Sequence, residues 1–153
     1  MFTLYNCLKF LHVCAVIVWV GGVVTLVVVN ARLARERETA ALQALSRQAE
    51  FLGKALIGPA AIITLLAGGT LVWSMGLGMP VWVVWGLVGF FGSMAIGAFL
   101  MQRAGRELSL LSAAPQPDHA RMANLRRRLS TLGILNIIVL LSTVWAMVFK
   151  PML

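Results

Sequence analysis

The chain alternates between long apolar runs and shorter polar segments. Four runs with almost no charged residues cover 4–29, 52–75, 81–101 and 132–149. Each run reaches or approaches the ~20 residues that a helix needs to cross a hydrocarbon core of ~30 Å. Because lipid offers the backbone no hydrogen-bond partner, we expect helices rather than strands. The pattern predicts an all-α protein, a transmembrane four-helix bundle with up-down-up-down connections.

The composition agrees with a protein that lies almost entirely in the membrane. Of the 153 residues, 60% are hydrophobic and 12% are charged, whereas a soluble domain carries about 25% charged residues. The first run is too long for a signal peptide, and it has neither a basic segment before it nor a small-residue cleavage site after it. We interpret residues 1–153 as a single integral membrane domain with polar loops at 30–51 and 102–131.

Basic residues gather on one side of the predicted membrane. Five lie at or next to the first loop and six in the second, namely Arg32, Arg35, Arg37, Arg47 and Lys54, then Arg103, Arg106, Arg121, Arg126, Arg127 and Arg128. The opposite side has only Lys9 and Lys150. The positive-inside rule predicts that both loops are cytoplasmic and both termini periplasmic in a bacterial inner membrane. The net charge of +8 therefore indicates membrane topology rather than nucleic-acid binding.

Aromatic residues support the same topology. Tyr5 and four of the five tryptophans, Trp73, Trp82, Trp85 and Trp145, fall at the predicted outer ends of the helices. Amphipathic rings favour the interface between lipid and water. Only Trp19 lies deeper.

Glycine and proline mark the expected breaks and close contacts. The connection GLGMP at 76–80 is short, which predicts a tight hairpin of the second and third helices. The Gly-Pro pair at 58–59 predicts a kink in the second. Gly89, Ser93 and Gly97 recur every four residues, a spacing that lets helix backbones approach closely, either within the bundle or between chains.

The first span carries the only polar chemistry within the predicted membrane core that suggests a site. In the stretch CLKFLHVCAVIVWVGG, Lys9, His12 and Trp19 share one helical face at 100° per residue. An ionisable group inside a span is a functional-site hypothesis. A neutral imidazole has one donor and one acceptor, and both need partners. Asn136 in the fourth span and Met94 in the third are candidates to meet it.

Three interpretations of His12 remain open. In the first, it makes a structural hydrogen bond to Asn136 or to a backbone carbonyl. In the second, it ligates the iron of haem b, and Lys9 pairs with a propionate. The only other histidine is His119 in a loop, so the opposite ligand would be a methionine, absent, or His12 of a second chain in a homodimer. In the third, His12 binds copper together with Met94 or a cysteine.

Several function classes find no support. All five acidic residues belong to the predicted cytoplasmic side, so no carboxylate is available for a proton relay or for hydrolysis within the membrane. The chain has no glycine-rich phosphate loop and no clustered zinc ligands. It offers no catalytic residue. The main alternative to cofactor binding is an accessory subunit or scaffold of a larger membrane complex.

The first span also resembles a known group of proteins. The pattern resembles the first span of CopD-type copper-resistance membrane proteins, of HemJ-type protoporphyrinogen oxidases, and of related four-span membrane proteins of unknown function, which it resembles most. The residues that carry it are Leu8, Lys9, Leu11, His12, Trp19 and Gly21. The resemblance to HemJ-type enzymes implies haem binding at His12, and the resemblance to CopD-type proteins implies copper handling. We expect a haem-b-binding or redox-associated protein, with Lys9, His12, Trp19 and Asn136 around the cofactor.

Overall fold

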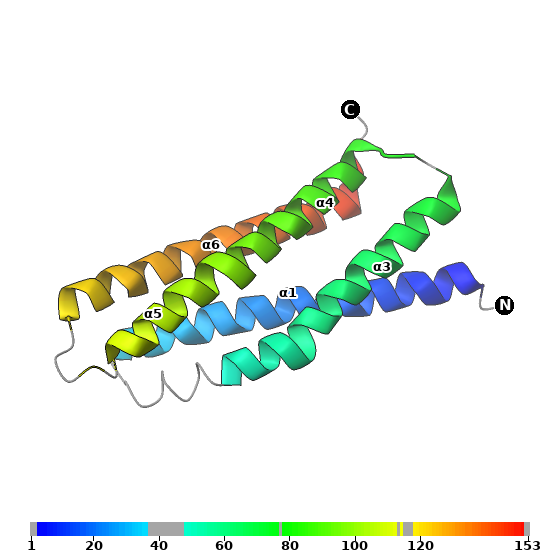
Figure 1. Cartoon of the computed structure of the whole chain (residues 1–153). Helices are drawn as coiled ribbons and strands as arrows, with labels where there is room; N and C mark the ends of the chain where they lie inside the picture. Colours follow the sequence, from blue (N-terminus) through cyan, green and yellow to red (C-terminus); the bar gives the residue numbers. More distant parts are fainter. Residues whose placement is uncertain (1–2, 37–47, 77, 113, 115–117, 152–153) are drawn as a thin grey trace.

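The structure contains four helices of membrane-spanning length. The computed structural model describes residues 3–36, 48–76, 78–112, 114 and 118–151, and all regular structure within these ranges is helical (Figure 1). The four helices that are long and apolar enough to cross a membrane are Leu4–Arg32, Gln48–Met75, Val81–Ser112 and His119–Phe149. The predicted fold class, an all-α transmembrane four-helix protein, is confirmed.

The spans divide into the following elements. The first is a single helix, α1 (Leu4–Glu36). The second contains a π-helical turn, η1 (Gly53–Ile57), followed by α3 (Gly58–Met75). The third contains α4 (Val81–Met94), a π-helical segment η2 (Ala95–Met101) and α5 (Gln102–Ser112). The fourth is α6 (His119–Phe149).

The start of α6 is set by Asp118, whose carboxylate accepts a hydrogen bond of 2.9 Å from the backbone N–H of Arg121. This bond satisfies one of the backbone donors that a helix N-terminus leaves unpaired. All four helices extend past the predicted spans at the end that carries the arginines, so much of the polar sequence next to the loops is also helical.

Next to the Gly-Pro pair at 58–59, where the sequence predicts a kink, the structure has the π-helical turn η1. Pro59 has no backbone N–H, so a regular helix would lose a hydrogen bond at this point. The N–H of Gly58 instead donates to the carbonyl oxygen of Gly53, five residues back. A Cβ atom on Gly58 would lie 3.0 Å from that oxygen. The wider turn thus keeps the backbone hydrogen-bonded, as lipid requires.

The helices associate as two pairs. α3 packs along α1, α4 packs along α6, and the two pairs meet through α1 and α6. Among the described residues, α3 and α4 make almost no contact. The predicted tight hairpin of the second and third helices is therefore wrong, and the two helices are already separated where the connection joins them (Figure 1).

The separation of α3 and α4 follows from the positions of their small residues, which face other helices. On α3, Gly68 contacts the side chain of His12 on α1, and Ala60 and Ala61 lie in one buried cluster with Trp19 of α1. On α4, Gly86 and Gly89 contact side chains of α6. Close backbone approach drives helix association in lipid, so each helix packs against the partner that its small residues face.

One layer joins all four spans. Trp19 of α1 is only 4% exposed and packs in a cluster with Ala60 and Ala61 of α3, Phe90 of α4 and Leu140 of α6. The Trp19 and Phe90 rings lie 5.1 Å apart between centroids, at 60° to each other. This tilted geometry is favourable for aromatic pairs. We refer to these five residues as the Trp19 layer.

The small-residue face of the third span packs within the bundle. A Cβ atom on Gly86 would lie 2.0 Å from the methyl carbon of Met147, and one on Gly89 would lie 1.9 Å from Oγ1 of Thr143. Gly97 lies near the amide nitrogen of Asn136. These glycines of the third span therefore pack against α6 within one chain.

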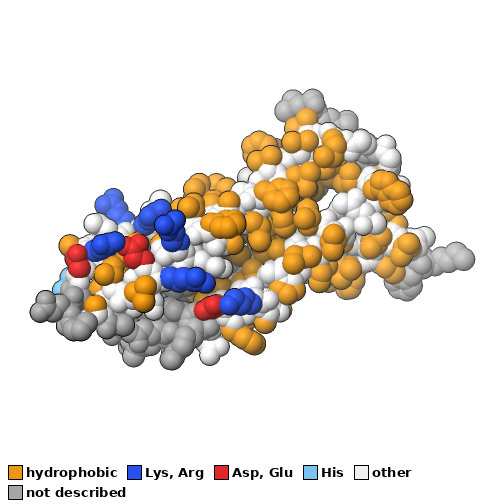
Figure 2. Space-filling model, viewed as in Figure 1, with side chains coloured by type: hydrophobic (Ala, Val, Ile, Leu, Met, Phe, Trp, Pro, Cys, Tyr) orange, Lys and Arg blue, Asp and Glu red, His pale blue; other side chains and the backbone are white. Residues whose placement is uncertain are grey.

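The surface separates charge from apolar side chains. Lysine and arginine gather at the end that contains α5 and the start of α6, and hydrophobic side chains cover much of the rest of the visible face (Figure 2). Large side chains such as Phe10, Leu66, Val88 and Ile138 are exposed along the spans. Since lipid solvates such side chains, this surface is typical of a protein embedded in a bilayer.

The contact between Gly89 and Thr143 gives a direct test of the helix pairs. We expect Gly89→Ala to lower the free energy of unfolding by roughly 1–3 kcal/mol, because its methyl group overpacks the interface between α4 and α6. Thermal unfolding in detergent micelles measures the effect.

Two further variants complete this test. Gly105→Ala is the matched control on the same span, since no atom lies within 4 Å of its added Cβ, and it should leave stability unchanged or slightly raised. Adding Thr143→Ala to Gly89→Ala removes the clashing oxygen and should restore part of the loss. Equal stability of Gly89→Ala and the wild type would contradict the observed interface.

Candidate functional site

His12 lies on α1, two turns from Trp19 and on the same helical face, and its side chain is half-buried. Its Nδ1 atom is 2.9 Å from the backbone carbonyl oxygen of Thr64 on α3. A carbonyl oxygen only accepts hydrogen bonds, so Nδ1 carries the hydrogen and donates it. This bond fixes the neutral imidazole in one tautomer and leaves the lone pair on Nε2.

The imidazole of His12 packs directly against Gly68 of α3. A Cβ atom on Gly68 would lie 2.8 Å from Cε1 of His12, 3.1 Å from Nδ1 and 3.8 Å from Nε2. The edge formed by Nδ1 and Cε1 therefore contacts the α3 backbone, and Nε2 is turned farther from it. Any side chain at position 68 would push the ring away from the Thr64 carbonyl.

The one hydrogen bond of His12 to a described residue is made through Nδ1, so Nε2 has no partner within the described ranges. Histidines that ligate metals commonly donate their other ring N–H to a carbonyl or carboxylate, which orients the ring and raises the basicity of the ligating nitrogen. The bond to Thr64 provides this arrangement. Of the structural partners proposed for His12, the backbone carbonyl is the one present.

The other predicted site residues lie at different depths. Trp19 is buried in its layer, about 10 Å of helix rise from His12. Met94 packs against the same layer, so the structure does not bring it to His12. Lys9 is exposed, one turn from His12 toward the N-terminus. Lys9 is therefore the predicted residue that remains close to the imidazole.

Asn136 occupies a separate position deeper in the molecule. Val27 of α1 packs against Gly133 of α6, and the two helices run in opposite directions. Val27 and Gly133 therefore mark one common depth in the bundle. At 1.5 Å per residue, His12 lies roughly 22 Å along α1 from this depth, and Asn136 lies about 5 Å along α6 from it in the same direction. The heights of His12 and Asn136 along the bundle thus differ by roughly 18 Å. Asn136 is 2% exposed, and its Oδ1 atom has no partner within the described residues.

The donor set around His12 favours a cofactor that needs one protein ligand. Within the described ranges, no group of three or more histidine, cysteine or acidic side chains could hold a metal ion. Cys7 and Cys14 are free, one exposed and one half-buried. A bare copper ion takes several donors from the protein, whereas the porphyrin supplies four nitrogens to a haem iron and one histidine can complete the attachment. A single oriented imidazole fits haem better than copper.

A depression of about 440 Å³ lies nearby but does not contain His12. It follows α3 and is lined by Leu65, Leu66, Gly69, Thr70 and Trp73. These residues lie on the side of α3 away from the face that carries Thr64 and Gly68, at 100° per residue.

Thr64 and Gly68 are not among the partners of His12 that the sequence predicts. Thr64 acts through its backbone carbonyl, which every residue type has. Gly68 acts through the absence of a side chain. The available signal was their spacing of four residues, which places two small residues on one face of the second span.

These features define the class of the molecule as a multi-pass integral membrane protein. A family model described as "Predicted integral membrane protein (DUF2269)" matches residues 6–151, and the chain belongs to this family. No curated protein and no solved structure gives a significant match. The expected membrane family is thus confirmed at this level, and the resemblance to CopD-type and HemJ-type proteins stays a prediction.

The hydrogen bond of His12 predicts a specific tautomer. In protein labelled with ¹⁵N-histidine and purified without added haem, we expect the His12 spectrum to show a protonated Nδ1 and an unprotonated Nε2. Gly68→Ala should change this spectrum, because its methyl group displaces the ring. Gly69→Ala adds a methyl group with no atom within 4 Å and should leave the spectrum unchanged. A wild-type spectrum with the proton on Nε2 would rule out the described bond.

Proposed function

We propose that this membrane protein binds haem b through Nε2 of His12 and takes part in redox chemistry. The observation that supports the proposal is the bond from Nδ1 to the Thr64 carbonyl, which leaves Nε2 as the free ligating nitrogen. When bound, haem b supplies one-electron chemistry. The likeness of the first span to HemJ-type proteins supports the same assignment.

Each residue near His12 has a defined part in this proposal. The Thr64 carbonyl orients the imidazole and strengthens it as a ligand. Gly68 admits the ring against α3. Lys9, one turn away and exposed, pairs with a propionate. Trp19 and Phe90 lie about 10 Å of helix rise deeper than His12 and would bound the site with apolar side chains. In a homodimer, His12 of the second chain would be a further residue able to hold the haem.

The test is an absorption spectrum of the protein purified after haem-replete expression, in oxidised and in dithionite-reduced form. We expect a Soret band and a reduced α-band in the wild type and their loss in His12→Ala. His119→Ala is the matched control, since it removes the only other histidine from the exposed start of α6, and it should keep both bands.

Four outcomes would overturn the proposal. A colourless wild type excludes haem, and copper content and co-purifying proteins are then measured. Copper that co-purifies and depends on His12 would identify copper handling of the CopD type. A partner that co-purifies without either cofactor would identify an accessory subunit or scaffold of a membrane complex. Haem retained in His12→Ala would place the cofactor elsewhere.

We further propose that the protein lies in a bacterial inner membrane with both termini outside the cytoplasm. The support is the asymmetry of charge and aromatic residues. The arginines gather at the end that holds α5 and the start of α6 (Figure 2). At the opposite helix ends, the Lys150 ammonium lies 5.4 Å from the centre of the Trp82 ring, and Trp73 and Trp145 are exposed. This distribution follows the positive-inside rule.

Cysteine labelling in spheroplasts tests this orientation. Cys7 and Cys14 are first replaced by alanine, and one cysteine is then introduced by Thr3→Cys or by His119→Cys. A membrane-impermeant maleimide should label Thr3→Cys in intact spheroplasts and His119→Cys only after lysis, because the two positions lie at opposite ends of the spans. The reverse pattern would show that the basic end faces outward.

A further inference from the structure

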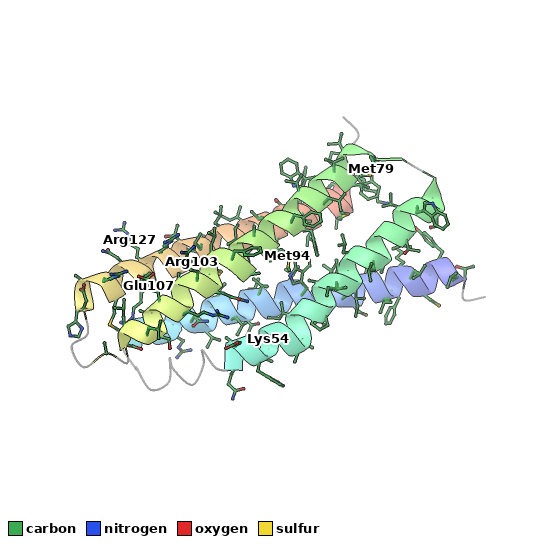
Figure 3. The ribbon with its side chains drawn as sticks, in the orientation of Figure 1. Lys54, Met79, Met94, Arg103, Glu107 and Arg127 are labelled. Atoms are coloured by element: carbon green, nitrogen blue, oxygen red, sulfur yellow. The ribbon has the colours of Figure 1, made fainter. Side chains whose placement is uncertain are left out.

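A pocket lies between the third and fourth spans, at the basic end of the molecule. It has a volume of about 320 Å³ and is lined by Leu100, Arg103, Ala104, Glu107 and Arg128. Figure 3 shows Arg103 and Glu107 on the third span and Arg127 on the neighbouring α6. This pocket is far from His12 and plays no part in the proposed haem site.

The pocket has an excess of positive charge. Its one acidic residue, Glu107, already accepts hydrogen bonds from Arg121, one of 3.0 Å from Nε and one from Nη2, both to the same carboxylate oxygen. Arg103 and Arg128 make no ion pair or hydrogen bond with any described residue. Within the described ranges, two guanidinium groups therefore line one cavity without a counter-charge of their own.

The depth of the pocket matches the boundary of the hydrocarbon core. Along the third span from Val81, the first charged residue is Arg103, and along α6 from Phe149, the first is Arg128. At 1.5 Å per residue, they lie roughly 33 Å and 32 Å from these ends, just beyond a hydrocarbon core of ~30 Å. Leu100, which is 40% exposed, lines the apolar side of the same pocket.

We propose that this pocket binds the headgroup phosphate of an anionic phospholipid. The guanidinium groups of Arg103 and Arg128 donate charge-assisted hydrogen bonds to the phosphate oxygens. An acyl chain lies along Leu100 and the lipid-facing side of η2. Basic pockets between helices at the membrane surface commonly bind such headgroups. Free phosphate is the weaker candidate, because it gains nothing from an apolar wall at the hydrocarbon boundary.

Native mass spectrometry in detergent tests the proposal with two lipids of identical acyl chains, phosphatidylglycerol and phosphatidylcholine. The wild type should bind one phosphatidylglycerol about tenfold more tightly than phosphatidylcholine. Both lipids offer a phosphate to the two guanidinium groups, but the choline cation of phosphatidylcholine is repelled by them, whereas phosphatidylglycerol keeps a net negative charge. The double variant Arg103→Gln/Arg128→Gln should lose this preference. Both side chains are exposed, so we expect folding to be retained, and each single variant should lose part of the preference.

A matched control separates this pocket from general attraction to anionic lipid. Arg106→Gln/Arg127→Gln removes the same charge from the same two spans, and neither residue lines the pocket. It should keep the preference within about twofold, because surface charges outside the pocket contribute little to one bound lipid. Equal losses in both double variants would overturn the proposal, as would equal binding of the two lipids by the wild type. Inorganic phosphate that displaces phosphatidylglycerol at similar concentration would assign the pocket to a soluble anion instead.

Discussion

In lipid, helices gain little from hiding apolar side chains, since the solvent is equally apolar. Close contact between backbones therefore decides which helices associate. Each of the two close pairs has small residues on one helix and larger side chains on the other. His12 lies against Gly68, and Thr143 lies against Gly89. The two pairs then meet at the Trp19 layer, where the large side chains Trp19 and Phe90 fill the space between them. The position of His12 against α3 follows from this pairing of helices.

This arrangement also explains why polar groups can persist inside the spans. His12 satisfies its donor with a carbonyl of α3, and the hydroxyl of Thr64 bonds to the carbonyl of Ala60 at 2.9 Å. Thr143 uses the carbonyl of Val139 in the same way. Each bond stays within a helix or a close pair, where no water is needed. Asn136 differs, because its Oδ1 atom is buried without a partner among the described residues. It is therefore distinct from the satisfied polar groups around it.

Much of the fold could be predicted from the sequence, because each membrane span is a long run of apolar residues. The four apolar runs, the basic end and the Gly-Pro pair at 58–59 are each local properties of sequence. The pairing of helices is not local. The short connection at 76–80 suggested contact between the second and third helices, but the small residues of these helices face α1 and α6 instead. For the site, the sequence identified His12 and its neighbour Lys9. Which residue supplies the carbonyl partner of His12 could not be predicted, since every residue type has the same backbone carbonyl.

The bond between His12 and Thr64 has a consequence for how genetic data on this protein are read. The acceptor belongs to the main chain, so replacement of the threonine side chain leaves it in place, and a mutational scan would record position 64 as tolerant. Position 68 offers no reactive group at all, yet nearly every substitution there would disturb the imidazole. A mutational scan would therefore identify Gly68 as sensitive and would not identify Thr64, although the carbonyl oxygen of Thr64 accepts the hydrogen bond from the ring. In this membrane protein, tolerance to substitution is a poor guide to which residue contributes the interaction.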